Sequence, residues 1–63
     1  MYAKYERTLG YRRVYGTDFP IRLLVEKQNR KFMVVKVCNG IAENHWLFPT
    51  LRQAAIFVRH YEL

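Results

Sequence analysis

The sequence predicts a small α+β domain in which an antiparallel three-stranded meander packs against one C-terminal helix. Three apolar segments of strand length, separated by short polar turns, lie between residues 21 and 48. A single amphipathic segment then runs from residue 51 to residue 61. The chain has only 63 residues, so we expect one domain over residues 1–63.

The helix is expected to begin directly after Pro49 and Thr50. Proline disfavours helix at the residue before it, and threonine is a favourable N-cap. Gln53 stands three residues after Thr50, where it completes a capping box. The apolar face of the helix, expected to lie on the sheet, comprises Leu51, Ala54, Ala55, Val58 and Tyr61, with Phe57 at its margin. Ile56 falls on the opposite face, where we expect it to be exposed or to meet a partner.

The three strands are expected over residues 21–26, 31–37 and 41–48, which are rich in Val, Ile, Leu and Phe. Residues 27–30 are polar and form the tip of the first hairpin. Asn39 and Gly40 separate the second strand from the third, and this dipeptide is the strongest short hairpin signal, because a type I′ turn needs φ > 0 at both positions.

The N-terminal segment alternates aromatic and basic residues. An additional fourth strand over residues 9–15 is an open alternative, with residues 1–8 as a mobile arm. Residues 16–20 have turn composition and are expected to end this segment. If the segment is a strand, alternate residues from Tyr5 to Tyr15 share one of its faces.

Alternation along the strands assigns their side chains to two faces of the sheet. The face toward the helix is expected to carry Ile21, Leu23, Val25, Met33, Val35, Val37, Ala42, Trp46 and Phe48. The reverse face is expected to carry Arg22, Leu24, Glu26, Phe32, Val34, Lys36, Glu43, His45 and Leu47. Half of this second set is apolar and needs cover. We expect residues 5–15 to supply it, with a second copy or a partner protein as the alternative.

The meander followed by Phe48-x-Thr50-x-x-Gln53-Ala54 resembles the arm-type DNA-binding domains of phage and transposon integrases, which have the AP2-like fold. The resemblance covers roughly residues 20–61 and implies a three-stranded sheet that enters the DNA major groove. Gln53 stands where that family usually has Glu, and no recombinase catalytic domain follows. The resemblance therefore implies a free-standing DNA-binding protein, such as an accessory or regulatory factor of a phage or mobile element.

The whole chain has a net charge of +6, and the positive charge is concentrated in its first half. Residues 1–31 hold eight Lys and Arg against three Asp and Glu, whereas residues 32–63 hold three against two. This asymmetry predicts an acidic partner, either nucleic acid, with DNA favoured over RNA, or an acidic protein. The residues expected to bind nucleic acid are Lys4, Arg7, Tyr11, Arg12, Arg13, Arg22, Lys27, Arg30 and Lys31. The alternative is that these tyrosines pack and the basic side chains are merely solvated.

A second hypothesis is an adaptor or inhibitor that docks on another protein through an apolar sheet face. Its expected interface residues are Leu24, Phe32, Val34 and Ile56. A homodimer through such a face is also open.

The sequence predicts neither an enzyme nor a cofactor site. It contains no serine and only three glycines, and it shows no paired carboxylates for acid–base chemistry. Cys38, His45 and His60 lack the short paired spacings of zinc ligands, so no metal is expected. The apolar runs are too short to span a membrane, and the single cysteine points to a reducing compartment. We therefore expect a cytoplasmic protein with no membrane partner.

Overall fold

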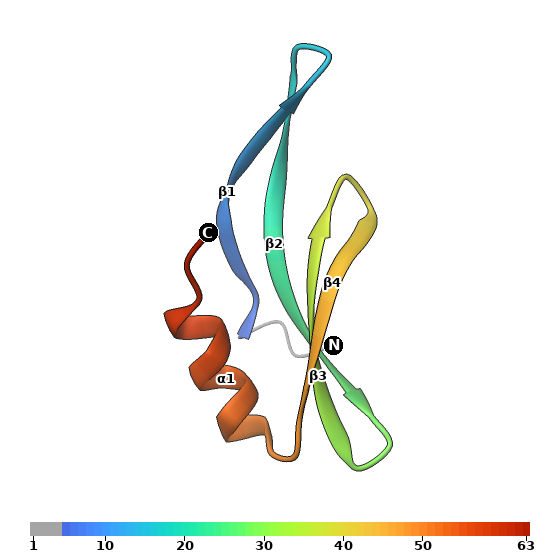
Figure 1. Cartoon of the computed structure of the whole chain (residues 1–63), viewed down its shortest axis with the longest axis vertical. Coiled ribbons are helices and arrows are strands. Elements are labelled where there is room, and N and C mark those ends of the chain that lie inside the picture. Colours follow the sequence, from blue (N-terminus) through green and yellow to red (C-terminus); the bar gives the residue numbers. More distant parts are fainter. Residues whose placement is uncertain (1–4) are drawn as a thin grey trace.

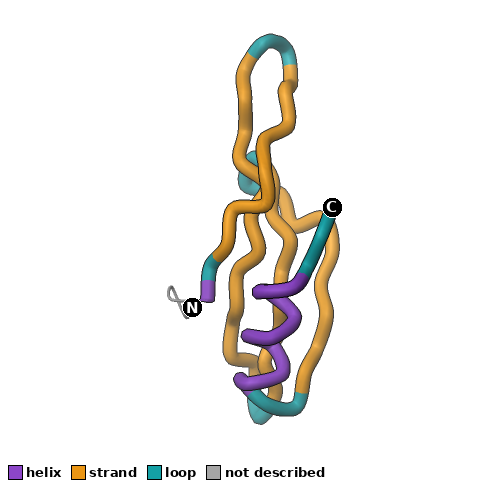
Figure 2. The backbone as a smooth tube through the Cα atoms, turned by 90° about the vertical axis from the view of Figure 1, so that its left-hand side faces the viewer, coloured by secondary structure: helices purple, strands orange, loops and turns teal. Residues whose placement is uncertain are grey.

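The computed structural model describes residues 5–63 and contains four strands followed by one helix. The elements are β1 (Arg7–Val14), β2 (Thr17–Gln28), β3 (Lys31–Cys38), β4 (Ile41–Phe48) and α1 (Leu51–His60). The strands form a single antiparallel sheet in the order β1-β2-β3-β4, and α1 lies along one side of it (Figures 1 and 2). The α+β class and the C-terminal helix are confirmed, and the N-terminal segment is a fourth strand.

β1 is an edge strand of the sheet, so the expectation that residues 5–15 cover the reverse face is wrong. Tyr15 and Gly16 both have positive φ, 50° and 81°, and Val14 pairs with Thr17 across them. Such a two-residue turn returns the chain antiparallel to itself in the plane of the sheet. β1 therefore extends the sheet instead of stacking on it.

The boundaries of the first hairpin also differ from those expected. Residues 7 and 8 of the expected arm belong to β1, and residues 1–4 lie outside the described part of the chain. The turn expected over residues 16–20 is shorter, because residues 17–20 are in β2. Pro20 is tolerated there because the pairing of β2 with β3 begins only at Ile21, so no ladder hydrogen bond to β3 is lost.

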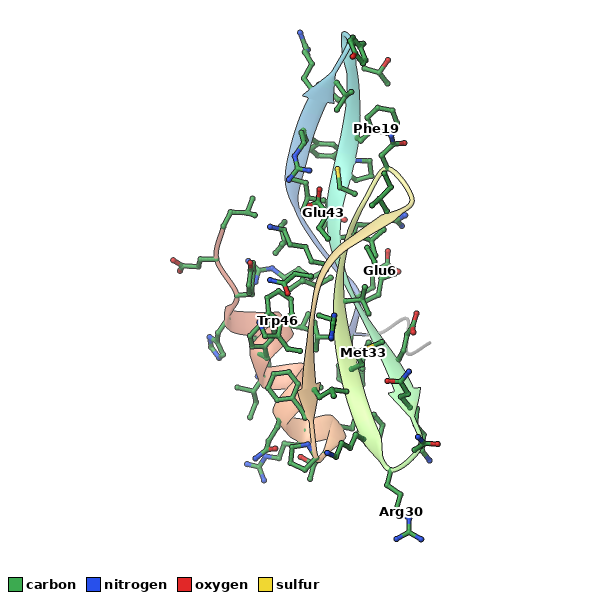
Figure 3. The ribbon with its side chains drawn as sticks, turned by 45° about the vertical axis from the view of Figure 1, so that its right-hand side comes forward. Glu6, Phe19, Arg30, Met33, Glu43 and Trp46 are labelled. Carbon is green, nitrogen blue, oxygen red and sulfur yellow. The ribbon has the colours of Figure 1, made fainter. Side chains whose placement is uncertain are left out.

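The face assignment of β3 was wrong by one residue. Asn29 and Arg30 form a two-residue turn, across which Gln28 pairs with Lys31 and Val25 pairs with Val34. Directly opposed residues share a face, so odd-numbered residues of β2 lie with even-numbered residues of β3. Phe32 and Val34 consequently face the helix, whereas Met33, Val35 and Val37 face away from it. In Figure 3, Trp46 lies beside the helix and Met33 lies on the side away from it.

Two β-bulges change the side-chain alternation of the outer strands. The register between β1 and β2 shifts at Leu9, and the register between β3 and β4 shifts at Glu43. A one-residue bulge exchanges the faces of the residues on its two sides. Arg7 and Leu9 therefore lie on the helix side, while Tyr11 and Arg13 lie on the other, contrary to the expectation that all four share a face.

The hydrophobic core lies between the sheet and α1. Its fully enclosed cluster consists of Leu23, Val25, Val34, Ala54 and Val58. Beside it, the ring of Phe57 lies 4.7 Å from that of Trp46 and 5.1 Å from that of Phe48, measured between centroids. Phe57, placed at the margin of the helix by its spacing, is therefore central to the packing of α1 on β4.

The start and the rotational orientation of α1 are as the sequence predicts. The backbone N–H of Gln53 donates to the hydroxyl of the N-cap Thr50 at 3.2 Å. Val58 is only 4% exposed, whereas Ile56 is 44% exposed. The predicted apolar face of the helix is confirmed.

The face of the sheet away from α1, which we call the open face, has an apolar strip along its centre. From the register, this strip consists of Leu24, Met33, Val35, Val37 and Leu47. Val35 is buried by its neighbours, but Leu47 is 52% exposed. No element of residues 5–63 packs over this face, since the only helix lies on the other side (Figure 1).

Candidate nucleic-acid interface

Three arginines that the sequence predicts as phosphate ligands hold carboxylates of this chain instead. Arg12 makes a two-pronged contact with Glu43, in which Nη2 donates to Oε1 at 3.2 Å and Nη1 donates to Oε2. In further ion pairs, Arg13 Nε lies 3.0 Å from Asp18 Oδ1, and Arg22 Nη1 lies 2.9 Å from Glu6 Oε1. These pairs are exposed and individually weak, but a phosphate would have to displace a carboxylate to use any of these guanidinium groups.

The ion pair between Arg12 and Glu43 should lower the pKa of the Glu43 carboxyl. The hydrogen bond from Arg12 is the main cause of the lowered pKa, and the charges of Arg12 and Lys36 act in the same direction. A pKa lowered in the folded state means that the pair stabilises the fold above the ordinary glutamate pKa of about 4.3 and is lost as pH falls through the folded value. NMR titration of the side-chain carboxyl should show the pKa rising in Arg12→Ala. The control Arg13→Ala should leave it unchanged, and an unchanged pKa in Arg12→Ala would contradict the pairing.

Arg7, also predicted to bind nucleic acid, instead holds the C-terminal end of α1. Its Nη1 atom donates to the carbonyl oxygens of Val58, Arg59 and Tyr61 at 2.9, 3.1 and 2.6 Å. The last carbonyls of a helix have no partners within the helix and carry partial negative charge. This guanidinium satisfies them, so its role is to connect β1 to the helix.

Three of the other predicted ligands lie with Arg52 at one end of the molecule, which we call the basic end and define as Lys27, Arg30, Lys31 and Arg52. The first three belong to the tip of the β2–β3 hairpin, where Arg30 projects away from the sheet and the helix (Figure 3). Arg52 is in the first turn of α1. Because Phe32 pairs with Phe48, the end of β4 and the start of α1 lie beside the start of β3, at the same end of the molecule (Figure 1).

No side chain of the basic end makes an ion pair or a hydrogen bond with another residue of the described chain. The carboxylate nearest to this hairpin tip along the chain is Glu26. The first turn of α1 contains no acidic residue, so the positive end of the helix dipole is also uncompensated. The basic end therefore combines four free cations with a favourable local field for an anion.

Polar side chains able to contact bases accompany these cations. An open depression of about 430 Å³ is lined by Gln28, Asn29, Arg30, Lys31 and Leu47. Amide and guanidinium side chains are the groups that bind base edges bidentately, Asn and Gln on adenine and Arg on guanine. The hairpin tip thus carries both phosphate-binding and base-reading types of residue.

The other residues named from the sequence are dispersed. Tyr11 is 70% exposed on the first hairpin, on the same side of the sheet as Arg13. Phe32 and Val34, expected at a protein interface, pack in the core instead. Of the other two expected interface residues, Leu24 lies on the open face and Ile56 lies on the exposed side of α1. Lys4 lies outside the described residues. Arg52 was not among the predicted ligands, although its place in the first helical turn could have suggested it.

Within residues 5–63, no group of three or more His, Cys, Asp and Glu side chains is arranged to hold a metal ion. The helix that the structure describes is neither long nor apolar enough to cross a membrane. Comparisons of the chain with protein-family models, with curated proteins and with solved structures find no match. The similarity to integrase arm-type domains consequently stays a prediction.

Proposed function

We propose that this chain is a small DNA-binding module that contacts nucleic acid through its basic end. The observation that carries the proposal is the presence there of Lys27, Arg30, Lys31 and Arg52, all without anionic partners in the described chain. Phosphate contacts supply most of the affinity of such proteins. The net charge of +6 adds long-range attraction to any polyanion.

The shape of the basic end favours the major groove of duplex DNA. A two-stranded β-ribbon fits into this groove, whereas the major groove of A-form RNA is too narrow for side chains to read. In this arrangement Gln28 and Asn29 face base edges, while Lys27, Arg30 and Lys31 contact the flanking phosphates. The contact therefore uses a hairpin tip, not the sheet face that the integrase resemblance implies, because that face here is largely apolar.

The salt dependence of binding tests this proposal. Each phosphate contacted on duplex DNA contributes about −0.9 to the slope of log K against log salt concentration. Arg30→Ala/Lys31→Ala should flatten the slope by up to roughly 1.8 if both side chains touch phosphate. The measurement is fluorescence anisotropy with a labelled DNA duplex and with an RNA duplex of the same sequence, over a series of salt concentrations.

Arg12→Ala/Arg13→Ala is the matched control, since it also removes two adjacent cations. These arginines hold Glu43 and Asp18, so their loss should change the slope much less. Equal effects of the two double variants would place the contact elsewhere on the chain. Absence of salt-dependent binding to both duplexes by the unmodified protein would refute the proposed function.

A further inference from the structure

The open face differs from the rest of the surface in its charge. By register and ion pairing, its charged residues are Arg13, Arg22 and Lys31, balanced by Glu6, Asp18 and Glu26. The other described charges are Arg7, Arg12, Lys27, Arg30, Lys36, Arg52 and Arg59, against only Glu43 and Glu62. The open face is therefore neutral, and the excess positive charge of the described chain lies elsewhere.

A neutral face with an apolar centre is unsuited to nucleic acid. It offers no net attraction to phosphates, and Met33, Val37 and Leu47 cannot pair with the donors and acceptors of base edges. It also offers no attraction to a strongly acidic protein. The partner that matches this face has an apolar strip of similar size and balanced charges around it.

We propose that this partner is a second copy of the same chain, bound open face to open face. A two-fold axis brings the same patch of both copies together, so an apolar strip meets an identical strip. Two twisted sheets stack in this way about 10 Å apart, as in a β-sandwich. Because the face has no net charge, the positive charge of each copy points outward and does not oppose the contact at close range.

The dimensions of the sheet are adequate for such a contact. Four strands of eight or more residues, at about 3.3 Å per residue and about 4.8 Å per strand, cover roughly 500 Å², with β1 offset along the sheet because it pairs with residues 17–23 of β2 and β3 pairs with residues 21–28. The rough side-chain surface over that footprint approaches the ~600 Å² per partner at which stable interfaces begin. The need for a partner is also clear, because only eight described residues are buried within one copy. Domains of this size commonly gain stability from oligomerisation.

Sedimentation equilibrium over a concentration series reaching the millimolar range tests the dimer directly. The protein should approach twice its chain mass of 7.7 kDa. High salt should preserve or tighten the dimer, because salt screens the repulsion between the two positively charged copies and does not weaken the apolar contact. Leu47→Lys should raise the dissociation constant roughly 100-fold, because it places a charge in the apolar centre of the contact.

Ile41→Lys is the matched control. Ile41 is on the same strand and is 63% exposed, but it pairs with Cys38 on the helix side of the sheet. This variant should dimerise as the unmodified protein does. A monomer at every concentration would overturn the proposal and leave the open face to a different protein, and equal weakening by the two variants would overturn the assigned face.

A second measurement does not depend on any variant folding. In a mixture of labelled and unlabelled protein, isotope-filtered NOEs should connect the methyl groups of Met33, Val37 and Leu47 between copies. Contacts between copies through α1 or Ile41 would instead refute the open-face dimer. Lys31, at the margin of the open face, is the one residue that the basic end and the open face share, so loss of DNA binding in Arg30→Ala/Lys31→Ala with an intact dimer would separate the two proposals.

Discussion

Val58→Asp should unfold the protein, whereas Ile56→Asp should leave it folded. Val58 is almost entirely enclosed and packs in the cluster that includes Leu23, Val25 and Val34. A carboxylate at that position would lose its hydration without gaining a partner, since none of the side chains of that cluster can donate a hydrogen bond. Ile56 lies two residues earlier on the exposed side of the same helix.

The magnitude follows from the small size of the domain. A chain of this length has a free energy of unfolding of roughly 3–9 kcal/mol. An unpaired buried charge costs a comparable amount, whereas an exposed substitution usually changes stability by only about 0.5 kcal/mol. Circular dichroism with urea titration is the measurement. A cooperative transition in Val58→Asp at the urea concentration of the unmodified protein would show that α1 does not pack through this face.

Arg7→Met should lower the free energy of unfolding by about 2 kcal/mol, because it removes charge-assisted hydrogen bonds to the end of α1. Methionine keeps much of the apolar stem, so the loss reports on the guanidinium. The carbonyls of Val58, Arg59 and Tyr61 would each lose a donor, and the hydrogen bonds to Val58 and Tyr61 are partly buried. The melting temperature should fall by roughly 8–16 °C for a domain of this length.

Arg59→Ala is the control for this prediction. Arg59 is also a cation in the last turn of α1, and its side chain makes no hydrogen bond or ion pair with another described residue. Its replacement should change stability by no more than about 0.5 kcal/mol. If Arg59→Ala destabilised the protein as much as Arg7→Met, the effect would come from general charge at the helix terminus and not from the Arg7 contacts.

The elements of this fold were predictable because their signals are local. The Asn39-Gly40 dipeptide marks a two-residue turn in which both residues have positive φ, 53° and 73°. Thr50 caps α1 through a hydrogen bond to a residue three positions away. The 3.6-residue period placed Val58 inside and Ile56 outside. In each case the interacting residues are neighbours in the chain.

The faces of the outer strands and of β3 were less predictable. Side chains alternate with a period of two, so a single residue in a turn or a bulge exchanges the faces of everything beyond it. Neither the bulge at Leu9 nor that at Glu43 has a glycine at the inserted position to mark it. The faces of β3 are nevertheless predictable from the sequence. Whether the turn between β2 and β3 has two residues or four, Val25 lies on the same face as Phe32 and Val34.

The candidate site shows the same division between local and long-range information. Composition and local patterns predict that the protein is basic, that a polar hairpin tip carries Lys27, Arg30 and Lys31, and that one amphipathic helix follows the strands. Which of these cations lack an anionic partner depends on the three-dimensional arrangement of the strands and the helix. Arg7 reaches the end of α1 across 51 residues of chain, and Arg12 reaches Glu43 across 31. The physical reason is that an ion pair depends on distance in space, which strand register and bulges set, whereas composition counts every charge alike.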